Sequence, residues 1–249
     1  MKKKFGDWLR TILARYGYVL WKRDFLLYGI DPFLDIQRLS RAREMSTEVF
    51  FDVGANEGQT AIAARKAFPG ARIYCFEPHP STYGRLQMNL ADSHIMTLPV
   101  ALSDHEGKVP FYEYATPGGG THVNSLVPDA PFTTHYGFHA NQQTVQSLTL
   151  DGFCLQEGIG RIDVLKIDTE GSELMVLNGA KRMLSEGRIV FVYVEYFDLF
   201  QRPGVTGGGL VPIAEYLAPF GYSYVSSYTD YISEKELFMV ANALFAKRV

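Results

Sequence analysis

The segment DVGANEGQT, residues 52–60, has the residue types of a turn that binds a ligand. Gly54 and Gly58 let the backbone turn sharply and come close to a ligand, where a side chain would collide with it. The helix that we expect after this turn offers free backbone N–H groups at its start. Asp52 precedes the turn and brings a carboxylate that could hold an ammonium group. The segment therefore indicates a ligand site at the start of a helix.

Glu77 lies 25 positions after Asp52 and ends a second apolar run, ARIYCFE. A carboxylate in this place can accept hydrogen bonds from both hydroxyl groups of an adenosine ribose. The dinucleotide pattern G-x-G-x-x-G is absent, because Asn56 stands where its second glycine would be, and no Gly-Lys-Ser/Thr of a Walker-type loop follows. The alternative is an ordinary turn with a solvated glutamate. The turn and Glu77 together favour a nucleoside site of another kind.

From about residue 48 onward, short apolar runs alternate with segments of helical periodicity. The pattern predicts strands at 49–54, 71–77, 95–102, 162–168 and 188–196, and helices at 59–68, 81–90, 172–184 and 211–217. Strands that are apolar on both faces and alternate with helices form parallel sheets covered on both sides. The last two predicted strands, 221–226 and 237–244, are too close for a helix between them, so we expect an antiparallel hairpin.

The predicted fold class is therefore α/β, a doubly wound sheet with an antiparallel edge. Such sheets bind ligands beyond the carboxyl ends of the strands, where the strand order reverses. Pro99 predicts an end or irregularity inside the third strand. The middle of the chain, about 103–147, has a predicted hairpin strand at 109–114 and otherwise reads as a long loop. A loop of that length is usually functional or disordered.

One known family has segments like DVGANEGQT, FEPHP, VALSDHEG and, above all, DVLKIDTEGSELMVLNGA. The sequence resembles the FkbM family of S-adenosylmethionine-dependent methyltransferases from about residue 29 to about residue 197. The resemblance implies the class I methyltransferase (Rossmann-like) fold, a seven-stranded, mostly parallel, doubly wound sheet whose last strand is antiparallel. We expect an N-terminal helical extension, residues 1–46, followed by an S-adenosylmethionine-binding methyltransferase domain, residues 47–249.

The same resemblance implies which residues hold S-adenosylmethionine. Asp52, Gly54, Asn56 and Gly58 would line its methionine part, Glu77 would hold its ribose, Ser103 and Asp104 would lie at its adenine, and Asp168, Glu170 and Gly171 would lie beside its sulfonium. Acidic residues suit this cofactor, because its sulfonium and ammonium groups are both positively charged.

Methyl transfer to a hydroxyl group needs an acceptor aligned with the methyl carbon and a general base for the hydroxyl proton. The candidates for the base are Asp168, Glu170, His122, His135, His139 and Glu195. Asp168 and Glu170 are favoured, because they follow the fourth predicted strand, nearest the methyl group in this fold. His122 is kept as a third candidate, since a histidine side chain titrates near neutral pH.

Asp168 and Glu195 end adjacent predicted strands. Together they could hold a divalent cation that lowers the pKa of the acceptor hydroxyl group. His135 and His139 have the spacing of two metal ligands on a helix, but Gly137 between them weakens that interpretation. Only position in the sequence supports either metal site.

The leading hypothesis is an S-adenosylmethionine-dependent O-methyltransferase that acts on a hydroxyl group of a sugar, a glycan or a secondary metabolite. One alternative is an N-methyltransferase of a small molecule, although no Asn-Pro-Pro-Tyr motif follows the fourth strand. A second alternative is a non-catalytic module that only binds the cofactor. A nicotinamide-dependent oxidoreductase is disfavoured by the glycine spacing.

Composition limits the partners and the compartment. The chain has 249 residues, 47% of them hydrophobic, and a formal net charge of −3, which does not favour nucleic acid. Cys75 and Cys154 are too few for a disulfide framework or a thiolate zinc cluster, so we expect free thiols and a cytoplasmic location. The oligomeric state is left open.

The N-terminal segment 5–21 places apolar residues at helical spacing with lysine and arginine between them. It is too interrupted by charge for a signal peptide or a membrane-spanning helix. Three interpretations remain: a helix packed on the domain, a basic amphipathic helix in peripheral contact with a membrane, and a cap over the acceptor.

Overall fold

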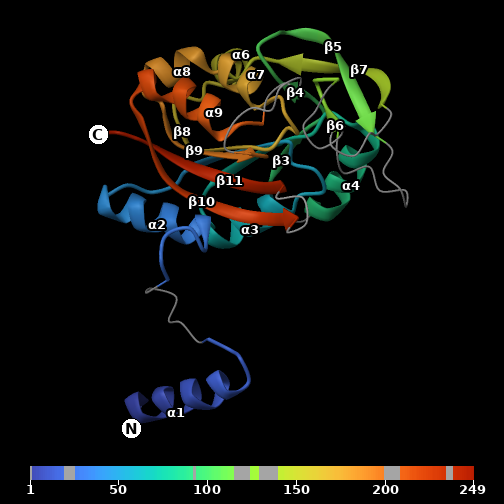
Figure 1. Ribbon diagram of the computed structural model, residues 1–249. Coiled ribbons are helices and arrows are strands. Elements are labelled where there is room, and N and C mark those ends of the chain that lie inside the picture. Colours follow the sequence, from blue (N-terminus) through green and yellow to red (C-terminus); the bar gives the residue numbers. More distant parts are fainter. Residues whose placement is uncertain are drawn as a thin grey trace.

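A seven-stranded sheet forms the centre of the protein (Figure 1). The structure, a computed structural model, describes residues 2–19, 26–91, 94–114, 124–128, 140–198, 208–233 and 238–249. In spatial order the strands are β10 (Tyr222–Ser233), β11 (Phe238–Lys247), β9 (Ile189–Tyr196), β8 (Ile162–Ile167), β1 (Val49–Val53), β2 (Arg72–Phe76) and β3 (Met96–Leu98). From β9 to β3 the neighbours are parallel, whereas β11 is antiparallel to both β9 and β10. The predicted fold class is confirmed.

Helices cover both faces of this sheet (Figure 1). On one side are α2 (Pro32–Ala42), α3 (Gln59–Ala67) and α4 (Pro80–Leu90); on the other are α6 (Leu150–Gln156), α7 (Glu173–Asn178), α8 (Lys181–Ser185) and α9 (Leu210–Leu217). Successive strand residues point to opposite faces, so Phe50 packs with the first group and Phe51 with the second. Because β1 is buried on both faces, its apolar sequence needs no alternation.

The predicted third strand is divided into two strands that belong to different sheets. β3 ends at Leu98, and β4 (Ala101–Leu102) pairs with another partner. The expected irregularity at Pro99 is therefore confirmed, since proline cannot donate a hydrogen bond to a continuing ladder. The predicted helix 172–184 is also divided, because α7 ends at Asn178 and α8 begins at Lys181.

A second, four-stranded sheet occupies much of the middle of the chain, where we expected a long loop. Its order is β4, β7 (Ala140–Leu148), β5 (Gly107–Tyr114) and β6 (Asn124–Ser125). β5 contains the predicted strand 109–114, but β7 was missed. Its sequence, ANQQTVQSL, is mostly polar, so the antiparallel backbone pairing with β5 forms it rather than a pattern of buried side chains.

The N-terminal extension consists of two helices with different surroundings. α1 (Lys2–Arg15) confirms the predicted helix, and Figure 1 shows it apart from the sheet. α2 belongs to the core, because Ile36 packs in the same cluster as Phe50 and the Tyr228 hydroxyl donates to Asp35 at 2.8 Å. In the part of the chain that the structure describes, no helix is long and apolar enough to cross a membrane.

Candidate active site

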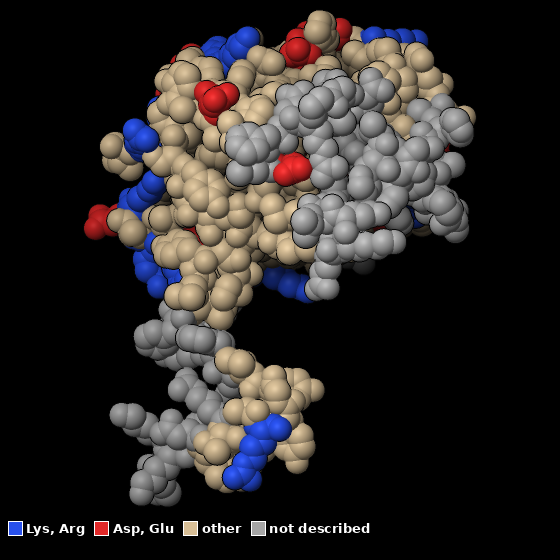
Figure 2. Space-filling view, in the orientation of Figure 1, with Lys and Arg blue, Asp and Glu red and all other residues tan. Residues whose placement is uncertain are grey.

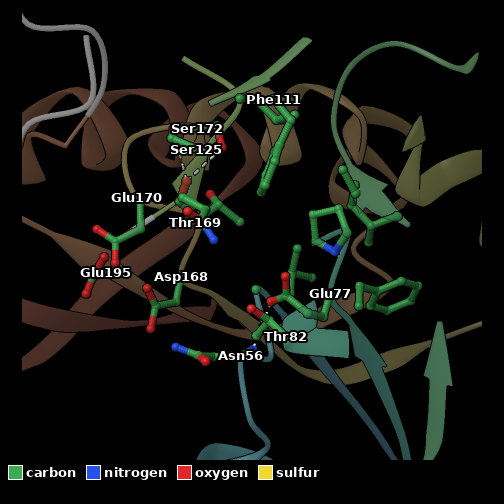
Figure 3. A pocket seen from close by; sticks show the side chains of 18 residues that line it. Asn56, Glu77, Thr82, Phe111, Ser125, Asp168, Thr169, Glu170, Ser172 and Glu195 are labelled. Atoms are coloured by element: carbon green, nitrogen blue, oxygen red, sulfur yellow. Dashed lines mark hydrogen bonds between the residues drawn. The ribbon is translucent and has the colours of Figure 1, made fainter. Parts of the chain in front are cut away.

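A cavity of about 130 Å³ opens at the carboxyl ends of the central strands, as predicted from the fold (Figure 3). Ends of β1, β2, β8 and β9 form its floor, and the second sheet forms one wall. The lining residues are Val53, Gly54, Asn56, Phe76, Glu77, Pro78, Thr82, Ala101, Leu102, Phe111, Asn124, Ser125, Leu126, Asp168, Thr169, Glu170, Ser172 and Glu195.

The turn after β1 packs directly against the end of β8. A Cβ atom on Gly54 would lie 1.7 Å from the backbone oxygen of Asp168, and Gly54 has a φ angle of +78°. Only glycine fits this position, for reasons of both space and conformation. The amide of Asp168 donates to the Val53 oxygen at 3.0 Å, so the two strand ends are joined at the cavity floor.

Glu77 is held in place by two backbone N–H groups. Its Oε2 accepts from the Asn56 amide at 3.1 Å, and its Oε1 accepts from the His79 amide at 2.9 Å. Burial raises the pKa of Glu77 to about 7, although these two hydrogen bonds oppose that shift. Each carboxylate oxygen has a second lone pair, so Glu77 can still accept hydrogen bonds from a ligand.

Asp52 lies beneath the cavity floor and does not line the cavity. It is opposite Lys166 in the pairing of β1 with β8, and it is fully buried. Within the described residues neither of its carboxylate oxygens has a hydrogen-bond partner. Burial raises the pKa of Asp52 to about 7, against the lowering effect of the Lys166 charge. Lys166 donates to Asp168 Oδ2.

Three carboxylates gather on the opposite side of the cavity from Glu77 (Figure 3). Oxygen atoms of Asp168, Glu170 and Glu195 all lie within 4.8 Å of one another. Burial raises the pKa of Glu195 well above its ordinary range, and the charges of Asp168 and Glu170 add to that shift. Burial also raises the pKa of Glu170, and the charges of Asp168 and Glu173 add to that shift. Asp168, Glu170 and Glu195 therefore form an acidic cluster on one side of the cavity.

The loop that presents this cluster is built around Glu173. Its Oε1 accepts from the amides of Thr169 and Gly171 at 3.2 and 2.9 Å. Between them Glu170 adopts a φ angle of +55°, a conformation that non-glycine residues rarely take and that is concentrated at functional sites. Glu173 thus holds the loop whose backbone aims Glu170 into the cavity.

Several predicted site residues lie elsewhere. Within the described part of the chain, Gly58, Ser103 and Asp104 do not line the cavity. Ser103 shares a buried hydrogen bond with Ser147, and the Asp104 carboxylate lies 2.6 Å from His105 Nδ1. The candidates His122, His135 and His139 lie outside the described residues. The structure thus brings together Gly54, Asn56, Glu77, Asp168, Glu170 and Glu195, and their individual roles stay predictions.

Sequence reasoning missed the wall that the second sheet contributes. Phe111 from β5, Asn124 and Ser125 from β6, and Leu126 line the cavity. The only available signal was the predicted strand 109–114, which contains Phe111. Thr82 near the start of α4 and Thr169 beside the acidic loop were also missed, since isolated threonines carry no distinctive spacing.

A comparison with family models identifies the chain. The methyltransferase FkbM domain matches residues 52–224, which is more than half of the sequence and contains Gly54, Glu77 and the acidic cluster. The chain belongs to the FkbM methyltransferase family. The predicted family is therefore confirmed.

Several named proteins similar to this FkbM-family chain are methyltransferases. It is 29% identical to 2-O-methyltransferase NoeI of Sinorhizobium fredii, over 62% of this chain and 65% of NoeI. It is 28% identical to hexuronic acid methyltransferase AglP of Haloferax volcanii, over 64% of this chain and 61% of AglP. It is 26% identical to 31-O-demethyl-FK506 methyltransferase FkbM of Streptomyces tacrolimicus, over 78% of this chain and 80% of that protein. The chain thus spans less than two thirds of the length of NoeI and AglP.

Proposed function

We propose that this protein transfers a methyl group from S-adenosylmethionine to a hydroxyl group of a sugar, a glycan or a natural product. One observation carries the proposal: a single cavity has Glu77, fixed by two N–H groups, at one end and Asp168 with Glu170 at the other. The names of the relatives NoeI, AglP and FkbM support the substrate class, since they include 2-O-methylation, a hexuronic acid and an O-demethylated natural product.

Glu77, whose ionised form offers only acceptors, would accept hydrogen bonds from the ribose hydroxyl groups of the cofactor. Gly54 and Asn56 would line its methionine part, where the absence of a side chain on Gly54 keeps the floor open. Asp168 and Glu170 would face its sulfonium. In the described part of the chain no lysine, arginine or histidine lines the cavity, so its electrostatics favour a cationic cofactor.

The reaction is an in-line displacement at the methyl carbon. The carbon–sulfur bond breaks and leaves its electron pair on sulfur, while the acceptor oxygen forms the new carbon–oxygen bond. The hydroxyl proton passes to Glu170, the member of the favoured pair that is not paired with Lys166. Alignment of the acceptor with the methyl group contributes about 7–11 kcal/mol at best, so positioning outweighs the contribution of the base.

The location of the protein and its surface contacts belong to the same proposal. Cys75 and Cys154 are buried free thiols, which fits a reducing cytoplasm. α1 lies apart from the sheet, its Trp8 side chain is 57% exposed, and Figure 2 shows basic side-chain surface on this protruding helix. We infer that α1 makes a peripheral contact with an anionic membrane surface.

Isotope labelling tests the function directly. The protein is incubated with methyl-labelled S-adenosylmethionine and a host extract, and mass spectrometry identifies the product that gains the label. We expect the label on a hydroxyl oxygen, and we expect no labelled product with Asp168→Asn. A label found on a nitrogen atom of the product would contradict O-methylation and indicate an N-methyltransferase. Tight cofactor binding without any labelled product would favour the non-catalytic module.

A further inference from the structure

We propose that Asp168, Glu170 and Glu195 bind one divalent cation with a preference for oxygen ligands, of the Mg²⁺, Mn²⁺ or Ca²⁺ class. Glu195 lies on β9, whereas Asp168 and Glu170 lie in the loop that follows the neighbouring parallel strand β8. Carboxylate oxygens are the ligands that these cations take in proteins. The binding site is thus assembled by the sheet rather than by one helix or one loop.

The spacing of the oxygens suits one shared ion. Candidate ligand atoms of the three residues all lie within 4.8 Å of one another. Two oxygens on opposite sides of Mg²⁺ are separated by about 4 Å, and around Ca²⁺ by about 5 Å, so a shared ion needs only small side-chain adjustments. Figure 3 shows the three carboxylates turned toward the same part of the cavity.

An unpartnered buried oxygen provides an independent observation. Glu195 is only 6% exposed, and its Oε2 has no hydrogen-bond partner in the described part of the protein. A buried carboxylate oxygen without a partner loses its hydration and gains nothing in return. Because Glu195 lines the cavity beside Asp168 and Glu170, a bound cation would supply the missing interaction.

The local charge balance also favours a cation at this place. Lys166 is the basic group that pairs with the cluster, and it donates to Asp168 from beneath the cavity floor. Among the described residues that line the cavity, no lysine, arginine or histidine faces Glu170 and Glu195. A divalent ion compensates two carboxylates at once, which water cannot do.

The role of the ion rests on the proposed function, whereas its binding does not. Held by Asp168, Glu170 and Glu195, the ion would supply a positive charge that makes a nearby acceptor hydroxyl group more acidic. Glu170 would accept the hydroxyl proton on its second oxygen, since one oxygen of that carboxylate suffices for the ion.

Manganese titration tests the site without any turnover. Full-length protein is treated with a chelator, saturated with S-adenosylhomocysteine and titrated with Mn²⁺ alone, while electron paramagnetic resonance measures the free ion. We expect one Mn²⁺ per chain, displaced by excess Mg²⁺. Glu195→Gln and Asp168→Asn should each weaken Mn²⁺ binding by about tenfold or more.

Glu113→Gln is the matched control. Glu113 lies on β5 next to His79, outside the cluster, so its substitution should leave Mn²⁺ affinity unchanged. Thermal melting followed by circular dichroism checks that each variant folds. If the Glu195→Gln variant does not fold, Glu170→Gln is measured in its place. The proposal is overturned if the parent protein binds no Mn²⁺ at millimolar Mn²⁺ concentration. It is also overturned if the parent and all folded cluster variants bind Mn²⁺ with equal affinity. A chain that binds Mn²⁺ here but methylates no hydroxyl group overturns the proposed function alone.

Discussion

The two ends of the cavity differ in how far the protein itself satisfies their acidic groups. At one end, each oxygen of Glu77 accepts a backbone N–H group before any ligand binds. At the other end, an oxygen of Glu195 is buried without a hydrogen-bond partner among the described residues, and Glu170 adopts a strained backbone conformation. The first end is preorganised, whereas the second reaches its most favourable state only with a ligand.

The largest effect is expected where the two ends meet. Gly54→Ala forces a Cβ atom toward the Asp168 backbone oxygen, at a position with a positive φ angle. We expect a loss of about 3 kcal/mol or more in the free energy of unfolding, together with loss of cofactor binding. Chemical denaturation and calorimetry measure both quantities.

Gly84→Ala is the matched control for this substitution. Gly84 lies inside α4, and an added Cβ atom meets nothing within 4 Å. The same chemical change should therefore be neutral or stabilise the protein by up to about 1 kcal/mol. Equal stability of the two variants would show that the close approach of β1 and β8 is not required.

The acidic end should control turnover rather than cofactor affinity. Glu170→Gln removes the proposed base, so we expect kcat to fall by about 10²–10⁴-fold with little change in the Kd of S-adenosylmethionine. A labelled-methyl assay and calorimetry separate the two effects. Glu157→Gln, an exposed change beyond α6, serves as the control. A large change in cofactor Kd with unchanged kcat would reverse the assignment of the two ends.

The preorganised end should control cofactor affinity. Glu77→Gln keeps the shape of the side chain but replaces one acceptor with a donor, so we expect the Kd of S-adenosylhomocysteine to rise about tenfold or more. Asp104→Asn, measured beside it, tests the predicted adenine contact. An unchanged Kd of S-adenosylhomocysteine in the Glu77→Gln variant would contradict the proposal that the ribose binds at this end of the cavity.

The smallest expected effect is on the pH dependence of stability. The pKa of Asp52 is about 7 in the folded protein, against an ordinary value of 3.8, so its neutral form favours folding. Its contribution is fully present below about pH 4 and is lost as pH rises through about 7. The ligand-free protein should therefore become less stable mainly between about pH 4 and pH 7, and less steeply in Asp52→Asn. Denaturation across this range measures the two slopes; equal slopes would contradict the burial of a titrating Asp52.

Much of the fold was predictable from local pattern. Apolar runs between helical segments indicated β1, β2, β8 and β9, because strands buried on both faces need continuous apolar sequence. The glycine turn and Glu77 were recognisable because both follow strand ends in the sequence. The strand β7 was not, since its polar residues are held by backbone pairing with β5.

By itself the sequence determined where the glycine turn must lie and that Glu77 and Asp168 end two strands of a parallel sheet. The tertiary structure alone decided how close the three carboxylates come: oxygens of Asp168, Glu170 and Glu195 lie within 4.8 Å of one another, although α7 and α8 lie between Glu170 and Glu195 in the chain. The physical reason is the parallel pairing of β8 with β9, which brings the carboxyl ends of strands distant in sequence to one edge. The same pairing leaves one oxygen of Glu195 buried, without a hydrogen-bond partner among the described residues.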